Sequence, residues 1–86
     1  MKITWDEPKR LANIDKHGFD FADIDIDFFP SAIIRPARGN RLMAIGRLDG
    51  LSLTVIFARL GREGVSIISM RHARQTERRL LNDREN

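Results

Sequence analysis

The side chains best suited to chemistry in this chain are two histidines that stand next to cations. His17 follows Lys16 directly before a glycine that is expected to end a helix, and His72 follows Arg71. An unperturbed histidine titrates near pH ~6.5, so it accepts or releases a proton at neutral pH. Arginine binds phosphate oxygens through a planar guanidinium with parallel donors. These residue types favour acid–base chemistry at a phosphodiester, with His17 as the first candidate for the titrating group and His72 as the second.

Cleavage of an RNA backbone without a metal has three requirements. A base removes the proton of the 2′-hydroxyl, an acid protonates the leaving oxygen, and cations stabilise the charge that develops on the phosphate. The candidates for these catalytic roles are His17, Lys16, Arg71 and Glu77. Each also has a structural alternative: His17 as a cap of helix carbonyls, Lys16 and Arg71 as solvated cations, and Glu77 as the ion-pair partner of a nearby arginine.

Other kinds of catalytic centre are not indicated. The two histidines lie far apart in the sequence and the chain has no cysteine, so no metal-ligand spacing is present. The aspartates between residues 20 and 27 lack the glycine and the closing glutamate of a calcium loop. The sequence also has no glycine-rich phosphate loop. We therefore expect neither a metal nor a cofactor.

Formal charge is distributed unevenly along the chain. Residues 1–34 hold four cationic side chains against seven acids, whereas residues 35–86 hold eleven arginines and no lysine against five acids. Basicity that rests on arginine alone suits phosphate recognition, because arginine binds phosphates bidentately and stacks on bases. A solvated basic face, or one that binds an acidic protein, is the alternative that charge leaves open. RNA is the polyanion that we expect as a partner.

Length and hydropathy narrow the class of protein further. With 86 residues, the chain is expected to form a single domain over residues 1–86. No stretch has the composition of a signal peptide, and no apolar run approaches the roughly 18 residues of a membrane span. We therefore expect a cytoplasmic protein with no membrane partner. A core of this size supplies only about 3–5 kcal/mol, so a partner subunit would add stability.

Turn residues and periodicity indicate the elements that must position these side chains. A strand is predicted at Lys2–Trp5, followed by a helix that begins after the N-cap Asp6 and ends at Gly18. Residues 19–29 fit both a helical stripe and a strand alternation, so periodicity leaves that segment open. The segment 73–84 favours a polar closing helix. Between them we expect an antiparallel meander, and hence an α+β fold, with strands at Ser31–Pro36, Arg41–Leu48, Leu51–Leu60 and Val65–Met70.

The turns also predict how the strands pair. Asp49-Gly50 is typical of a two-residue type I′ turn, and a four-residue loop follows the next strand. These turns predict four cross-strand pairs: Arg47 with Ser52, Ile45 with Thr54, Leu60 with Val65, and Thr54 with Arg71. One face of the sheet is then apolar and should pack against the helices; it carries Leu42, Ala44, Leu48, Leu51, Leu53, Val55, Phe57, Ile68 and Met70.

The other face, called the mixed face below, combines cations, hydroxyls and apolar side chains. It carries Arg41, Met43, Ile45, Arg47, Ser52, Thr54, Ile56, Ile67, Ser69 and Arg71. Its cations and hydroxyls gather mainly at one end, where they would form a phosphate-binding surface with arginines of the adjoining helix. The predicted RNA-binding residues are Arg41, Arg47, Ser52, Thr54, Ser69, Arg74 and Arg78.

Several residues at fixed spacing match a family signature. The first half follows the pattern W-D-x-x-K-x-x-x-N-x-x-K-H-G-x-x-F from Trp5 to Phe21, which includes Asn13, Lys16 and His17. The second half contributes Ile45-Gly46, Val55-Ile56-Phe57, Gly61, Ile67-Ile68-Ser69, Arg71-x-Ala73-Arg74 and Glu77-Arg78. By these residues the chain resembles the BrnT-type ribonuclease toxins of bacterial type II toxin–antitoxin pairs, which share the RelE-like fold.

The resemblance implies a helical segment at residues 19–29 and a metal-independent endoribonuclease that blocks translation. It also implies that a DNA-binding, BrnA-like antitoxin neutralises the chain by covering its basic face. The assembly is left open between a homodimer of this chain and a heterotetramer with the antitoxin. The chain departs from the family pattern at two places. Leu51 follows the hairpin glycine, where the family often has an arginine, and Leu80 or Leu81 stands where the family often has a tyrosine. The alternatives are a non-catalytic module on the same fold that binds nucleic acid or protein, and a self-assembling interaction subunit.

Overall fold

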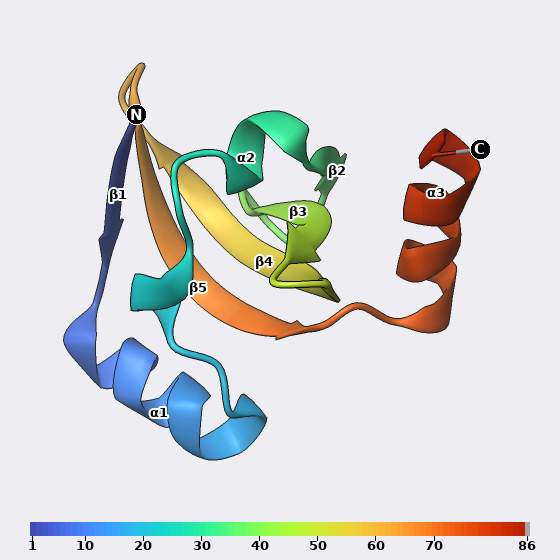
Figure 1. The fold of residues 1–86 in the computed structure, drawn as a ribbon. Helices are drawn as coiled ribbons and strands as arrows, with labels where there is room; N and C mark the ends of the chain where they lie inside the picture. Colours follow the sequence, from blue (N-terminus) through green and yellow to red (C-terminus); the bar gives the residue numbers. More distant parts are fainter. Residues whose placement is uncertain (86) are drawn as a thin grey trace.

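Five strands form one sheet in the computed structural model, which describes residues 1–85 (Figure 1). The elements in chain order are β1 (Lys2–Trp5), α1 (Glu7–His17), the 3-10 helix η1 (Phe21–Asp23), α2 (Phe28–Ser31), β2 (Ile33–Pro36), β3 (Leu42–Leu48), β4 (Leu51–Leu60), β5 (Gly64–His72) and α3 (Gln75–Glu85). The predicted α+β class and the antiparallel meander from β2 to β5 are confirmed. Within residues 1–85, no helix is long and apolar enough to cross a membrane.

The N-terminal strand forms one edge of this sheet. β1 pairs in parallel with β5, from Lys2 opposite Gly64 to Trp5 opposite Ile67. The strand order is β1-β5-β4-β3-β2, so β2 forms the other edge. Because β1 covers only the first part of β5, α1 lies beside the remainder of that strand. This placement brings one face of α1 to the border of the mixed face.

The core lies on the apolar face of the sheet. Phe21, Phe28 and Phe29, which come from the segment between α1 and β2, are buried there against the side chains of β4 and β5. The rings of Phe29 and Phe57 meet edge to face, with their centroids 5.1 Å apart. Gly46 in β3 admits this close packing, since a Cβ atom at its position would lie only 3.0 Å from the Phe28 ring.

The segment at residues 19–29 is helical only in two separate turns, η1 and α2. Asp20 and Asp25 each accept a hydrogen bond from the backbone N–H two residues further on. Such local bonds favour turns over a continuous helix. The predicted strand start at Ser31 is wrong for a related reason: Ser31 ends α2 with its hydroxyl bonded to helix carbonyls, so β2 begins at Ile33.

The β3–β4 hairpin agrees with its predicted register. Arg47 faces Ser52 and Ile45 faces Thr54. Asp49 has a φ of 52°, and the glycine after it has a φ of 80°. Two positive φ values are what a type I′ turn requires.

A β-bulge changes the register of the last hairpin. Thr54 faces Arg71 as predicted, but farther along β4 Leu60 faces Gly64, so the predicted pairing with Val65 is wrong. The register shifts because one residue of β5 stands unpaired opposite β4. No turn residue marks this position in the sequence.

The bulge exchanges two isoleucines between the faces of the sheet. Ile67, predicted on the mixed face, is buried in the core with 1% of its surface exposed. Ile68, predicted in the core, is the unpaired residue and is only half-buried. Leu51, also predicted in the core, is 44% exposed beside the hairpin turn.

α1 begins and ends as predicted. The Asp6 side chain accepts a hydrogen bond from the backbone N–H of Lys9, and Gly18 adopts the left-handed conformation at a φ of 78°. Asn13 then fastens the helix to the sheet, because its side-chain amide donates to the carbonyl oxygens of Phe19 and Met70 at 2.9 Å each. Its side-chain oxygen accepts the backbone N–H of Met70 at 3.0 Å.

We expect Asn13→Ala to lower the free energy of unfolding by about 2 kcal/mol, because the buried backbone of Met70 loses its partners. Urea unfolding followed by circular dichroism measures the change. Asn40→Ala is the matched control, since Asn40 is exposed in the β2–β3 turn. Equal stability of the two variants would contradict the prediction.

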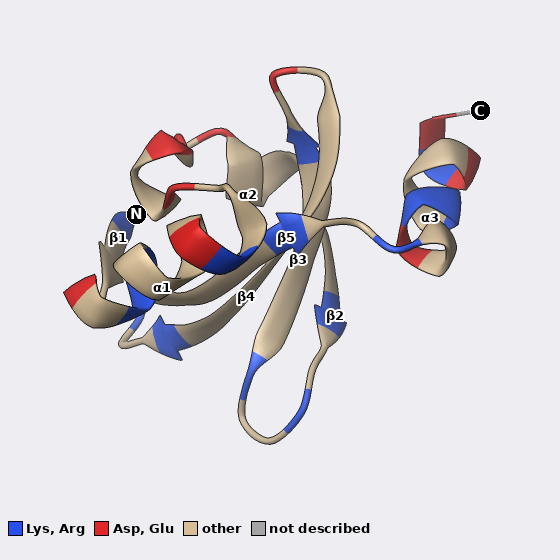
Figure 2. Ribbon diagram, turned by 90° about the horizontal axis from the view of Figure 1, so that it is seen from below, with Lys and Arg blue, Asp and Glu red and all other residues tan. Residues whose placement is uncertain are grey.

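α3 lies on the mixed face, on the opposite side of the sheet from α2 (Figure 2). Its residue Leu81 is fully buried, and so are Ile45 and Thr54 on the mixed face. Arg84 of α3 donates to the carbonyl oxygen of Ser31 at 2.7 Å. α3 therefore covers part of the surface that the sequence predicts to be open.

Candidate nucleic-acid interface

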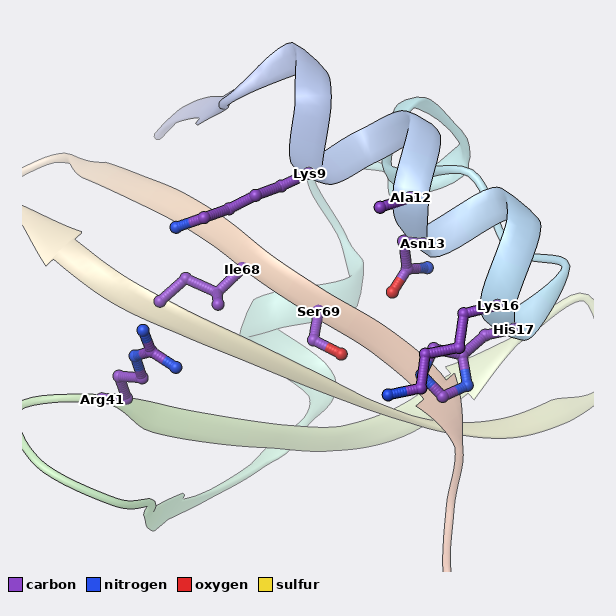
Figure 3. A pocket seen from close by; sticks show the side chains of 8 residues that line it. All are labelled: Lys9, Ala12, Asn13, Lys16, His17, Arg41, Ile68 and Ser69. Atoms are coloured by element: carbon purple, nitrogen blue, oxygen red, sulfur yellow. The ribbon is translucent and has the colours of Figure 1, made fainter.

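A cleft of about 280 Å³ opens between α1 and the part of the mixed face that α3 leaves uncovered (Figure 3). One helix face forms its wall, because the residues follow the spacing i, i+3, i+4, i+7 and i+8; they are Lys9, Ala12, Asn13, Lys16 and His17. Ile68 and Ser69, at the bulge of β5, contribute the floor. Arg41, just before β3, faces α1 across the cleft.

The side chains around this cleft carry positive charge without acidic partners. Lys9 extends from α1 over the sheet at the end of the cleft where Arg41 lies, and Lys16 extends over the sheet beside His17 at the other end (Figure 3). No acidic residue lines the cleft, and none of these three cations forms a salt bridge within residues 1–85. Ammonium and guanidinium groups that are not already paired bind phosphate oxygens through charge-assisted hydrogen bonds. The cleft therefore fits a phosphate group.

His17 lies at the Lys16 end of the cleft. Burial lowers the pKa of its imidazole below the ordinary value of 6.5, and the positive charges of Lys16 and Arg71 lower this pKa further. All three causes disfavour the charged imidazolium. His17 is therefore neutral at pH 7, which is the form that accepts a proton.

We expect Lys16→Met to raise the pKa of His17, because a neighbouring positive charge no longer opposes protonation. The pH titration of the imidazole protons by NMR measures this pKa. Lys2→Met, which removes a lysine from β1 and away from the cleft, should leave the titration unchanged. A His17 pKa that falls or stays constant in Lys16→Met would show that Lys16 does not influence the imidazole.

Arg71 and Glu77 form a salt bridge where β5 leads into α3. The two nitrogens of the Arg71 guanidinium bond the two carboxylate oxygens of Glu77 at 2.8 and 3.0 Å. One oxygen of Glu77 also accepts the hydroxyl of Thr54 at 2.9 Å and the backbone N–H of Arg74 at 2.7 Å. This last bond is half of a capping box at the start of α3.

These partners give Glu77 a structural role and remove it as a general base. The hydrogen bonds from Arg71 are the main cause that lowers the pKa of the Glu77 carboxyl from 4.5 to about 2, and bonds from Arg74 and Thr54 add to the effect. A carboxylate with so low a pKa holds a proton poorly at neutral pH. The side chain is also 8% exposed. The predicted catalytic role of Glu77 does not fit this geometry.

α3 also contacts two predicted RNA-binding residues, Thr54 and Arg47. Thr54 is fully buried and bonded to Glu77, so it offers no surface to a ligand. Arg47 bonds the Ser52 hydroxyl at 2.9 Å and the carboxylate of Glu85, at the end of α3, at 2.6 Å. At this end of the sheet Thr54 is therefore removed from the expected phosphate-binding surface, and Arg47 is exposed but already paired with Glu85.

The comparisons with known proteins identify the family. A family model described as the ribonuclease toxin BrnT of type II toxin–antitoxin systems matches residues 5–77. This chain belongs to the BrnT ribonuclease toxin family. The matched range contains every residue of the cleft. It also confirms the resemblance that the W-D-x-x-K and K-H-G motifs indicate.

A solved structure supports this membership of the BrnT family. The crystal structure of the Brucella abortus ribonuclease toxin BrnT has 55% sequence identity to this chain and a TM-score of 0.80. The match covers 87% of this chain and 99% of that one. Among curated protein sequences, none matches at a significant level. Membership in the BrnT family implies RNA as the target and an antitoxin as the partner.

In this member of the BrnT family, the predicted site residues divide into groups. The cleft brings together His17, Lys16, Arg41 and Ser69. Arg71 lies close enough for its charge to act on His17, but its guanidinium is engaged by Glu77. The remaining residues lie outside the cleft: Arg47, Ser52, Thr54 and Glu77 contact one another or α3, Arg74 and Arg78 are exposed, and the ring of His72 packs against Phe19.

Lys9 is the charged residue of the cleft that the predicted site lacks. Its signal is present in the sequence, because Lys9 stands seven positions before Lys16 and therefore on the same face of the predicted helix. Ile68 lacks such a signal, since only the bulge brings it to the cleft floor.

Proposed function

We propose that this protein is an endoribonuclease that cleaves RNA in the cleft between α1 and the sheet without a metal. The observation that carries the proposal is a single cleft lined by three cations that have no acidic partner in the described chain and by a histidine whose pKa is lowered. Positive side chains stabilise charge on a phosphate as a metal ion does. Within residues 1–85, no three metal-ligating side chains of His, Cys, Asp or Glu are grouped together.

The cleft residues have distinct roles in this mechanism. Lys9 and Arg41, at the other end of the cleft, hold the RNA backbone beside the scissile phosphate, while neutral His17 removes the proton of the 2′-hydroxyl. The 2′-oxygen then bonds to phosphorus and the bond to the 5′-oxygen breaks, leaving a 2′,3′-cyclic phosphate. The Lys16 ammonium stabilises the developing charge and protonates the departing 5′-oxygen. Arg71 acts through its charge, which keeps His17 neutral before the reaction.

The biological consequence follows from the loss of RNA. Cleavage in the cytoplasm blocks translation, and a DNA-binding antitoxin neutralises the protein by covering the cationic cleft. Acidic side chains of such a partner would pair with cations that have no acidic partner in the described chain. Light scattering of the purified complex distinguishes a heterotetramer from a smaller assembly.

The test incubates the purified chain with single-stranded RNA, with and without EDTA, and follows cleavage on denaturing gels. We expect cleavage in both conditions and cyclic phosphate ends on the products. Arg41→Gln should cleave more slowly, while Arg62→Gln, which removes an arginine from the exposed β4–β5 turn, should cleave at the original rate. Intact RNA at stoichiometric protein would refute the enzymatic proposal, and loss of activity in EDTA would refute metal independence.

A non-catalytic RNA-binding module is the second candidate function. It is favoured by the position of Glu77, which lies outside the cleft and is engaged by Arg71, so that His17 is the cleft residue left to act as a base at neutral pH. This candidate predicts that the chain protects RNA from other nucleases without cutting it, which the same gels would show.

A further inference from the structure

The mixed face continues beyond the cleft to the β2 edge of the sheet. Arg35 of β2 faces Met43 of β3, which faces Ile56 of β4, which in turn faces Ser69 on the cleft floor. Residues that face each other in adjacent strands project to the same side of a sheet. One row of side chains therefore runs from the cleft, across two apolar residues, to Arg35, which is not among the predicted site residues.

This row lies in the part of the mixed face that α3 leaves open. Ile45 and Thr54, in the neighbouring row under α3, have no exposed surface, whereas Met43 and Ile56 are only half-buried. Arg35 is exposed, and its guanidinium bonds only the carbonyl oxygen of Ile34, at 3.0 Å, among the described residues. Met43 and Ile56 therefore form an accessible apolar floor with a cation available at its far side.

The row combines the two kinds of surface that a nucleic acid strand needs, positive charge and an apolar floor. Three strand spacings of about 4.8 Å separate β5 from β2, so Arg35 lies about 14 Å across the sheet from the cleft floor. A nucleic acid strand carries a phosphate at every step of its backbone and a flat base, with apolar faces, that projects from each sugar. An acidic peptide would use the cations but would have no need of the apolar floor between them.

We propose that Met43, Ile56 and Arg35 form a subsite for a nucleotide that flanks the scissile phosphate. The base packs on Met43 and Ile56, and Arg35 pairs with the phosphate beyond it. The RNA is single-stranded, because a base that is stacked in a helix cannot lie on the floor. The subsite rests on the proposed function for its position next to a cleavage site, but its binding can be tested without cleavage.

The test uses a labelled single-stranded RNA oligonucleotide that carries 2′-O-methyl groups, which cannot be cleaved through its 2′-oxygens. Fluorescence anisotropy at several salt concentrations gives its Kd for each variant. We expect Arg35→Gln to weaken binding about tenfold and to reduce the slope of log K against log salt by about 0.7, the value for one phosphate contact in single strands. Arg62→Gln is the charge-matched control. Equal Kd values and slopes for the two variants would overturn the subsite.

A second variant tests the apolar floor. We expect the unaltered chain to bind the oligonucleotide more tightly than an abasic strand of the same length, and Met43→Gln to narrow that difference. Circular dichroism verifies that Met43→Gln is folded; Ile56→Thr replaces it if it is not. Two results would overturn the base contact: the same difference in Kd in Met43→Gln as in the unaltered chain, or a double-stranded RNA that binds as tightly as the single strand. A polyglutamate that displaces the oligonucleotide as effectively as unlabelled RNA does would also overturn it.

The outcome separates this subsite from the proposed cleavage. If binding depends on Arg35 but the unaltered chain leaves unmodified RNA intact, the cleavage proposal is refuted and the subsite is retained. Cleavage of unmodified RNA with the same KM and the same cut positions in Arg35→Gln would retain the enzyme and refute the subsite.

Discussion

We expect the His17→Gln variant to cleave RNA about 10²–10⁴ times more slowly than the unaltered chain, the usual contribution of a general base. Glutamine has a similar size and forms hydrogen bonds, but it does not accept a proton at neutral pH. Single-turnover rate constants with excess protein measure the effect without contributions from product release. His72→Gln is the matched control, because its ring packs against Phe19 and outside the cleft. A His17→Gln variant that cleaves at the full rate would leave the proposed mechanism without its base.

The pH dependence of the unaltered chain gives an independent test of the same residue. A base works in its deprotonated form, so the rate should fall as the pH drops through the His17 pKa. Because burial and neighbouring charges lower that pKa, the fall should lie below pH 6.5. Lys16→Met should move the midpoint of this pH dependence to higher pH, and it should also lower the maximal cleavage rate. An acid limb above pH 6.5 would assign the titration to another group.

Local signals in the sequence predict much of the fold. Asp49-Gly50 specifies its hairpin, because both residues adopt the positive φ that the turn requires. Asp6 and Gly18 mark the two ends of α1 for equally local reasons. The cleft wall follows from the same helix, since periodicity places Lys16, His17 and the missed Lys9 on one face.

Features that depend on contacts between distant segments are not predictable in this way. The bulge at Ile68 has no turn residue or glycine to announce it, and it decides which isoleucine enters the core. The position of α3 is a second example, because the polar helix predicted from its composition gives no indication of the sheet face that it covers. Thr54 is consequently buried although its register is predicted correctly. A correct strand pairing thus does not determine whether a face is open to a ligand.

The second large effect concerns stability: we expect Glu77→Gln to lower the free energy of unfolding by about 3–5 kcal/mol, as when one partner of a buried ion pair is removed. The amide of glutamine cannot accept both nitrogens of the Arg71 guanidinium, and it leaves Arg71 without a counter-charge. The glutamine oxygen can keep the bonds from the Thr54 hydroxyl and the Arg74 N–H, but its NH2 group then faces a nitrogen of the Arg71 guanidinium, which is also a donor. Urea unfolding measures the change. Glu85→Gln is the control, because the exposed salt bridge between Glu85 and Arg47 should contribute little.

The same carboxylate should make the stability of the chain depend on acid. Glu77 has a pKa of about 2 in the folded chain, against an ordinary value of 4.5. A lowered folded-state pKa stabilises the fold fully above pH 4.5, and this stabilisation is lost as the pH falls toward 2; for a difference of this size it amounts to about 3 kcal/mol. The glutamine variant has no carboxylate to protonate. The gap in unfolding free energy between Glu77→Gln and the unaltered chain should therefore close as the pH is lowered from 5 to 2, whereas a gap that stays constant over that range would mean that the charge of Glu77 does not stabilise the fold.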